Sequence, residues 1–116
     1  VLGLDIDARK TDAINAGRSY IKHVAAEAVA EQRASGRLEA STDFSRVNEM
    51  EAVVLCAPTP LNAFREPDLS YVLDTGRALA PHLRRGMLVV LESTTYPGTT
   101  DGELREVLEA GSGLKA

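Results

Sequence analysis

Apolar residues fall into two kinds of segment along the chain. Short runs that are apolar on both faces predict buried strands, and stripes of apolar positions with a helical period predict amphipathic helices. Strands are expected at residues 1–6, 38–41, 52–57 and 87–91. Helices are expected between them, at about residues 8–16, 24–35, 68–80 and 100–110. This alternation predicts an α/β fold, a doubly wound parallel sheet with right-handed crossovers.

Residues that start and stop helices stand at the ends of these segments. Asp7 is placed to cap the first helix, and Gly17 supplies a left-handed stop after it. Thr100 and Glu103 have the spacing of a capping box for the last helix. Leu114 is expected to begin one more strand after that helix ends.

The third and fourth strands locate the centre of the sheet. Residues 52–57 and 87–91 are apolar on both faces, which is typical of parallel strands covered by helices on both sides. Cys56, at the end of the first of these runs, is therefore expected to be a buried, inert thiol. Ligands of doubly wound sheets bind beyond the carboxyl ends of the strands. That rule selects the segments at residues 5–7, 57–60 and 92–95.

Composition excludes several classes of protein. The chain has 116 residues, 44% of them hydrophobic and 26% charged, which suits one globular domain. Its net charge is −4 and it has no basic tract, which argues against nucleic-acid and anionic-membrane binding. The longest apolar run, residues 52–57, is far too short to span a bilayer. The sequence has neither a Cys/His cluster nor an HExxH spacing, so we expect no metal site.

Asp5 ends the first predicted strand. A carboxylate there can accept hydrogen bonds from the two hydroxyls of an adenosine ribose, and it would repel a 2′-phosphate, which favours NAD over NADP. The alternative role is capping of the following helix, which suits Asp7 better because Asp7 directly precedes that helix.

Hydroxyl side chains follow the third and fourth strands. Thr59 stands between two prolines, which leave its hydroxyl and N–H presented at the strand end. Ser93, Thr94 and Thr95 could orient a water or a substrate group. A rigid turn without a ligand, and hydroxyls that only satisfy the local backbone, remain open as alternatives.

A dinucleotide site also needs a glycine-rich turn about 20 residues before the acid. No Gly-x-Gly-x-x-Gly stretch occurs, and the chain begins at Val1 inside an apolar run. We therefore expect residues 1–116 to be part of a longer protein whose first strand and glycine-rich turn precede Val1. The unpaired sheet edge left behind would favour self-association of the isolated chain.

Four segments together resemble one known family. They are Gly-Leu-Asp-Ile-Asp at residues 3–7, Ala-Pro-Thr-Pro-Leu-Asn at 57–62, Arg-Glu-Pro-Asp-Leu-Ser-Tyr at 65–71 and Glu-Ser-Thr-Thr-Tyr-Pro-Gly-Thr-Thr at 92–100. Their order and spacing resemble the UDP-glucose/GDP-mannose dehydrogenase family, in particular its bacterial UDP-N-acetyl-glucosamine and -mannosamine 6-dehydrogenases. The resemblance implies that residues 1–116 are a partial, Rossmann-type NAD-binding domain.

The resemblance also implies roles for individual residues. Asp5 would bind the adenosine ribose of NAD, with Lys10 near it, and the adjacent Arg9 is the alternative to Lys10. Ala57, Pro58 and Thr59 would line the NAD site. Ser93 and Thr94 would lie near the nicotinamide, and Thr94 would help to position a catalytic water.

The activity implied by the resemblance is oxidation of a sugar C6 alcohol to a carboxylate with two NAD. The family's catalytic Cys, Lys and Asn lie in later segments. Cys56 does not match the catalytic Cys. The implied enzyme is a cytoplasmic homo-oligomer that acts on a UDP-sugar for polysaccharide synthesis, and the 116-residue chain alone is expected to be inactive. The alternatives are another NAD-dependent dehydrogenase, of the UDP-glucose, GDP-mannose or hydroxyacyl-CoA type, and a non-catalytic α/β interaction module.

Overall fold

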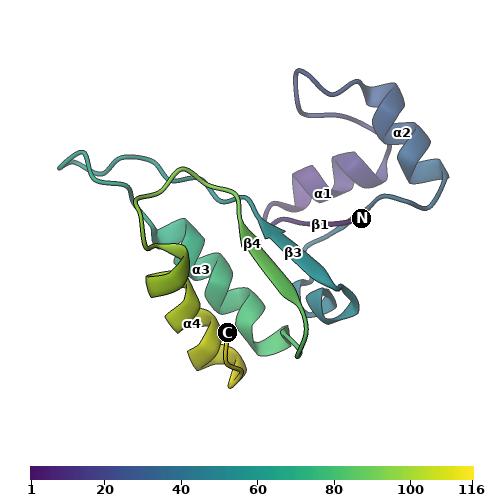
Figure 1. Ribbon diagram of the computed structural model, residues 1–116. Helices are drawn as coiled ribbons and strands as arrows, with labels where there is room; N and C mark the ends of the chain where they lie inside the picture. Colours follow the sequence, from purple (N-terminus) through teal and green to yellow (C-terminus); the bar gives the residue numbers. More distant parts are fainter. The chain divides into compact units, whose positions relative to one another are not determined.

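The computed structural model describes residues 1–116, which form two compact units, residues 1–44 and 45–116. Each unit contains one pair of parallel strands (Figure 1). The first unit consists of β1 (Leu2–Leu4), α1 (Ala8–Asn15), α2 (Ala26–Ala34) and β2 (Glu39–Ser41). The main elements of the second are β3 (Ala52–Leu55), α3 (Ser70–Leu79), β4 (Leu88–Leu91) and α4 (Arg105–Ser112). Parallel strands joined through helices confirm the predicted α/β fold class.

Short helical turns complete the second half of the chain. A 3-10 turn, Phe44–Glu49, precedes β3, and another, Ala80–His82, follows α3 and contains the proline predicted to end that helix. A π-helical turn, Thr100–Leu104, leads into α4. None of the helices is both long and apolar enough to cross a membrane.

The first unit is organised by polar residues at the two ends of α1. Asp7 caps the helix as predicted, because its carboxylate accepts the Arg9 backbone N–H at 3.0 Å. Gly17 follows the helix with a φ of +71°, also as predicted. On the last turn, the Asn15 side-chain amide both donates to and accepts from the Ala40 backbone, at 2.8 and 2.9 Å. The Asn15 amide thus bonds the Ala40 N–H and carbonyl as the backbone of a neighbouring strand would, and it connects α1 to β2.

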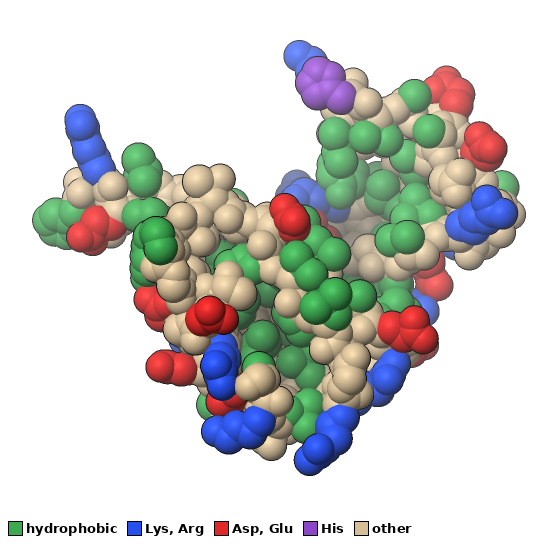
Figure 2. All heavy atoms as spheres, viewed as in Figure 1, with side chains coloured by type: hydrophobic (Ala, Val, Ile, Leu, Met, Phe, Trp, Pro, Cys, Tyr) green, Lys and Arg blue, Asp and Glu red, His purple; other side chains and the backbone are tan.

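In the second unit, β3 and β4 pair in parallel register from Ala52 with Leu88 to Leu55 with Leu91. Leu55 is buried, whereas the opposite face carries Val54 and Leu88, which are 59% and 60% exposed. Figure 2 shows apolar side chains at the surface over these strands. Within the second unit, α3 and α4 lie side by side next to the pair (Figure 1), and no helix of this unit covers the face of Val54 and Leu88, so the predicted cover on both faces is not found within this unit.

Two glycines bring α3 and α4 into close contact. A Cβ placed on Gly76 would lie 2.9 Å from Leu104 Cδ1, and one placed on Gly111 would lie 2.5 Å from Ala80 Cβ. Leu104 and Ala80 are among the most buried residues of the chain. The apolar stripe predicted for the last helix therefore does face the core.

The last helix begins differently from the prediction. Residues 100–104 form a π-helical turn in which the Leu104 N–H reaches the Thr99 carbonyl at 3.1 Å. The Glu103 carboxylate accepts the Tyr96 hydroxyl and does not turn back to cap the helix. The predicted capping box of Thr100 and Glu103 is thus wrong, because the acid is engaged by the preceding loop.

Two predicted strands also need correction. The strand expected at residues 1–6 is confined to Leu2–Leu4, and Ile6 is 86% exposed. Leu114 begins no strand; it follows Gly113, which ends α4 with a φ of +71°. In a doubly wound sheet of strand order 3-2-1-4-5-6, the second strand pairs with the third and the fourth with the fifth. The observed pairs match that order when β1 is taken as the second strand.

Candidate functional site

Asp5 directly follows β1 in the first unit. Its backbone N–H continues the strand ladder to the Ser41 carbonyl at 3.3 Å. One carboxylate oxygen accepts the Asp7 N–H at 2.8 Å, and the other lies 3.4 Å from Lys10 Nζ. The Asp5 side chain is 32% exposed. A carboxylate has about four acceptor positions, so Asp5 can still accept both hydroxyls of a ribose.

Lys10 is the basic residue beside Asp5. Its ammonium group lies between the Asp5 carboxylate and the Tyr20 ring, whose centroid is 5.9 Å from Nζ. The neighbouring Arg9 turns to Asp7 instead, with two guanidinium hydrogen bonds of 3.0 and 2.9 Å. That guanidinium lowers the pKa of Asp7, and the Asp7 carboxylate in turn raises the pKa of Arg9. The capping role therefore falls to Asp7, which is ion-paired with Arg9, and Asp5 is ion-paired with Lys10.

In the second unit, two hydrogen bonds join the loops that follow β3 and β4. Ser93 Oγ donates to the Ala57 carbonyl at 2.7 Å, and Thr59 Oγ1 donates to the Thr94 carbonyl at 2.7 Å. The donors come from opposite loops, so the contact is reciprocal. The structure thus brings the predicted residues Ala57, Thr59, Ser93 and Thr94 together, with Pro58 between the first two.

These bonds decide what each hydroxyl can still do. The protons of Thr59 and Ser93 are committed to backbone carbonyls, so their oxygens can act toward a ligand only as acceptors. Thr94 uses only its carbonyl in the contact and is exposed. Its hydroxyl is the one group of the three that can both donate and accept toward a water or substrate.

Two further features of this strand end were not singled out from the sequence. The Asn62 side chain accepts the backbone N–H groups of Phe64 and Glu66, at 2.9 and 3.0 Å, and so shapes the loop after Thr59. On the other loop, the Tyr96 hydroxyl donates to Glu103. Asn62, which follows Thr59-Pro60-Leu61, was a local turn signal. The pairing of Tyr96 with Glu103 depends on the π-helical turn, and no local sequence signal predicts it.

Cys56 departs from its prediction. It lies immediately after β3 and is exposed rather than buried. Cys56 shares a face of the strand with Ala52 and Val54, which are also exposed. The apolar run predicted a buried thiol, but no element of the second unit covers this face.

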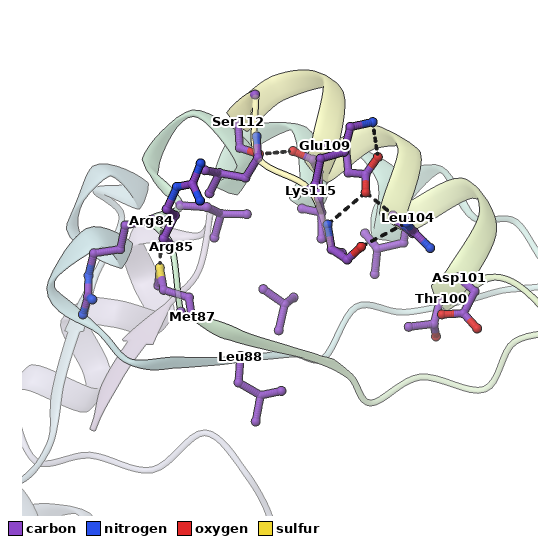
Figure 3. Close-up of a pocket in the computed structure, with 18 residues that line it drawn as sticks. Arg84, Arg85, Met87, Leu88, Thr100, Asp101, Leu104, Glu109, Ser112 and Lys115 are labelled. Atoms are coloured by element: carbon purple, nitrogen blue, oxygen red, sulfur yellow. Dashed lines mark hydrogen bonds and ion pairs between the residues drawn. The ribbon is translucent and has the colours of Figure 1, made fainter.

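A cavity of about 610 Å³ lies at the other end of β4, against α4 (Figure 3). Its wall includes Leu88, Leu104 and Leu108 together with several charged side chains. Glu109 organises the charged part, accepting Arg105 at 3.0 Å and Lys115 at 3.3 Å. None of the predicted site residues lines this cavity, so the strand-end loops and the cavity are separate features.

A model of the NAD binding domain of the UDP-glucose/GDP-mannose dehydrogenase family matches residues 1–116. The chain belongs to this family. Its match to the family's NAD-binding domain confirms the resemblance drawn from the four sequence segments and the assignment of NAD as cofactor.

The names of curated relatives of this chain indicate several nucleotide sugars. It is 39% identical over 87% of its length to an NDP-N-acetyl-D-galactosaminuronic acid dehydrogenase of Ralstonia nicotianae. It is 37% identical, over the same share, to the UDP-N-acetyl-D-mannosamine dehydrogenase of Escherichia coli. The matches cover 23% and 24% of those relatives, so the chain spans about a quarter of their length.

Solved structures of the family show the same fold. A ternary complex of GDP-mannose dehydrogenase from Pseudomonas aeruginosa superposes with a TM-score of 0.91 at 33% identity, covering 99% of this chain and 28% of that one. An NDP-N-acetyl-D-galactosaminuronic acid dehydrogenase from Methanosarcina mazei gives 0.89 at 38% identity, covering 100% and 26%. The predicted Rossmann-type fold class is thereby confirmed.

In the first unit, the part-exposed Asp5 carboxylate retains acceptor capacity at a strand end, which is where such folds bind a ribose. This geometry is compatible with the adenosine ribose of NAD. In the second unit, Thr59 and Ser93 offer hydroxyl oxygens whose protons are donated to backbone carbonyls.

Proposed function

We propose that this chain is the NAD-binding part of a nucleotide-sugar 6-dehydrogenase that oxidises the C6 alcohol of a UDP-N-acetylhexosamine to a carboxylate. The observation that carries the proposal is the reciprocal pair of hydrogen bonds between the Thr59 and Ser93 loops, in a chain of this family. That pair fixes a polar surface at two adjacent strand ends. The names of the relatives from Ralstonia and Escherichia favour an N-acetylated sugar.

Each residue of the site has a proposed role. Asp5 accepts the ribose hydroxyls of NAD, and Lys10 holds the Asp5 carboxylate in place. Ala57, Pro58 and Thr59 line the cofactor surface after β3. Ser93 orients the loop after β4 near the nicotinamide, and Thr94 holds a water at its hydroxyl.

The overall reaction requires two oxidation steps. NAD, when bound, supplies the acceptor for the hydride that leaves C6. Conversion of the alcohol to the carboxylate removes two hydrides, takes up one water and releases three protons, so two NAD accept the hydrides and are consumed per sugar. The residues of this chain bind and orient NAD and hold the water. The covalent chemistry requires a nucleophile, which Cys56 does not provide. We propose that a Cys, a Lys and an Asn elsewhere in the natural protein supply it.

The proposed setting is that of a biosynthetic enzyme. We propose a cytoplasmic homo-oligomer that makes nucleotide-linked uronic acids for surface polysaccharide, with the UDP-sugar as its partner and no membrane or nucleic acid involved. The isolated 116-residue chain is proposed to lack dehydrogenase activity, because it contains no glycine-rich phosphate-binding turn.

The test is an assay of the natural protein that carries this chain. NADH formation is measured with UDP-N-acetyl-glucosamine, UDP-N-acetyl-mannosamine, UDP-glucose and GDP-mannose. We expect two NADH per molecule of an N-acetylated UDP-sugar. A preference for UDP-glucose or GDP-mannose would keep the family and change the substrate, and the absence of NAD reduction with all four would refute the proposal.

Asp5→Ala tests the cofactor role separately. We expect NAD affinity to fall roughly tenfold or more, and the preference for NAD over NADP to shrink, because the acceptor for the 2′-hydroxyl is lost. Asp12→Ala removes the same charge from α1 away from the strand end and serves as the control. Equal NAD affinity in Asp5→Ala and Asp12→Ala would remove Asp5 from the site.

A further inference from the structure

The hydrogen bond between Tyr96 and Glu103 closes the loop that carries the candidate catalytic residue. Tyr96 OH donates to Glu103 Oε1 at 2.5 Å. Tyr96 lies in the loop after β4, two residues beyond Thr94, and Glu103 lies in the turn that opens the last helix. The bond therefore spans the loop and fastens its middle to the helix.

The π-helical turn accounts for the position of Glu103. Leu104 N–H bonds the Thr99 carbonyl at 3.1 Å, one residue further back than in an α-helix, while Gly102 N–H bonds the Gly98 carbonyl at 2.7 Å. The extra residue in the turn changes the direction in which the acid projects. Single π-helical turns are rare in helices and occur frequently at functional sites.

Thr99 makes the base of the loop rigid. It is 1% exposed, and its hydroxyl donates to the Tyr96 carbonyl at 2.9 Å. Tyr96 is thus held at its carbonyl by Thr99 and at its hydroxyl by Glu103. Beyond Tyr96, the loop reaches Thr94, whose carbonyl accepts Thr59. Hydrogen bonds thus fasten the loop to the helix at Tyr96 and to the neighbouring strand end at Thr94, and the short backbone segment from Thr94 to Tyr96 connects the two points.

The carboxylates near Tyr96 affect the ionisation of the Tyr96–Glu103 pair. The Glu103 carboxylate raises the pKa of Tyr96, and the Glu66 carboxylate raises it further. In return, the phenol lowers the pKa of Glu103. Glu103 and Glu66 are the charged groups that act on the phenol, so the protonated hydroxyl with an ionised Glu103 is the favoured pair at neutral pH.

We propose that Tyr96 and Glu103 form a latch that positions Thr94 for the reaction. Both are positioning residues, because they act through the loop and do not themselves contact a reacting group. The inference rests on the proposed dehydrogenase function. It extends that function by assigning a structural cause to the orientation of the Thr94 hydroxyl.

The kinetic test compares variants of the natural protein. Tyr96→Phe and Glu103→Ala are each expected to lower kcat about tenfold, with KM for NAD changed less than about twofold, because misplacement of a positioned group mainly affects the transition state. Glu103→Gln keeps an acceptor oxygen and is expected to retain most of kcat. The double variant Tyr96→Phe/Glu103→Ala should lose no more than either single variant, because the two residues act as one unit.

A spectroscopic test uses the phenol itself. Ultraviolet titration of wild type minus Tyr96→Phe isolates the ionisation of Tyr96. We expect it to occur above the ordinary range for tyrosine and to move to lower pH in Glu103→Gln, since the carboxylate that disfavours the phenolate is then gone. Tyr71→Phe, an exposed tyrosine of α3, is the matched control for both tests and should leave kcat unchanged.

The outcomes separate the latch from the proposed function. If wild type reduces NAD with a nucleotide sugar and Tyr96→Phe matches it in kcat, the latch is refuted and the function stands. If wild type reduces no NAD, the function fails. In that case an ordinary ionisation of Tyr96 in wild type also refutes the bond, whereas a raised one that moves in Glu103→Gln supports it.

Discussion

The Thr59 hydroxyl donates a hydrogen bond to the Thr94 carbonyl at 2.7 Å, although the two residues are 35 positions apart in the sequence. The returning bond from Ser93 to the Ala57 carbonyl has the same length. Two loops that lack regular secondary structure are thereby fixed to one another beyond the last rung of the β3–β4 ladder, where Glu92 N–H reaches the Leu55 carbonyl. These two hydrogen bonds extend the pairing of β3 with β4 into the loops of the proposed NAD site.

Replacement of Thr59 by Val should loosen this site without changing its shape. Val keeps the branched side chain and removes the donor, so the Thr94 carbonyl loses its partner. We expect kcat/KM for NAD to fall roughly tenfold in steady-state assays of the natural protein. Because the contact is exposed, the free energy of unfolding should change by no more than about 1 kcal/mol.

Thr75→Val is the matched control for that change. Thr75 donates to the Tyr71 carbonyl at 2.7 Å within α3, which is the same chemistry at a position remote from the strand end. Its kinetics should match wild type, and Thr59→Ser, which keeps the donor, should also retain activity. Equal kinetics for Thr59→Val and Thr75→Val would contradict a role for the inter-loop bond.

Gly111→Ala should destabilise the second unit. The new Cβ would lie 2.5 Å from Ala80 Cβ, and Ala80 is fully buried, so α4 must move away from the turn after α3. Overpacking of this kind costs about 1–3 kcal/mol, against a helix-propensity gain of about 0.5–1 kcal/mol. A lower urea midpoint is expected.

The same Gly-to-Ala change at residue 102, Gly102→Ala, should not destabilise the second unit. No atom lies within 4 Å of a Cβ placed there. Only the entropic gain remains, so the urea midpoint should rise or stay unchanged. If both variants shift the midpoint in the same direction, close packing at Gly111 does not explain its presence.

Glu109 should make stability depend on pH in the acid range. Hydrogen bonds from the Ala116 N–H and Arg105, together with Lys115, lower its pKa from 4.5 to about 2. A carboxyl group with a depressed pKa in the folded state contributes stability that is complete above 4.5 and is lost as the pH falls toward 2. Glu109→Gln should therefore melt below wild type at neutral pH, and the difference in Tm should shrink between pH 4.5 and 2.

Glu106→Gln is the control for the acid-range prediction. Glu106 belongs to the same helix but makes none of these contacts, so its variant should follow wild type across the pH range. A Glu109→Gln difference that stays constant down to pH 2 would show that the loss comes from packing and not from the ionised carboxylate.

The isolated chain should self-associate through the open face of β3 and β4. Val54 and Leu88 are more than half exposed on that face, and a contiguous exposed apolar patch favours association with another chain. Light scattering at high concentration should show oligomers, and Val54→Thr with Leu88→Thr should reduce them. Phe64→Thr removes an apolar side chain that is even more exposed, at 83%, but lies in a loop, and it should not reduce them. A monomeric wild-type chain would refute this expectation.

Local sequence signals predicted the elements of this fold well. Asp7 as a cap and Gly17 as a stop were both correct, because each depends only on a few neighbouring residues. The apolar runs at 52–57 and 87–91 predicted the parallel strands that the structure has at Ala52–Leu55 and Leu88–Leu91. The capping box at Thr100 was wrong, since its acid is taken by Tyr96, whose approach depends on the loop and the π-helical turn.

The sequence alone determined the α/β class, the family and the order of the strands and helices, because periodicity, caps and motifs depend on residues that are close together in the sequence. Tertiary structure decided which side chains meet. In the folded chain Thr59 is hydrogen-bonded to Thr94, Asp7 is ion-paired with Arg9, and Asp5 is ion-paired with Lys10. The tertiary structure also exposed Cys56 on a face that the pattern assigned to the core. Burial and long-range hydrogen bonds depend on which surfaces are covered, and no single segment encodes that.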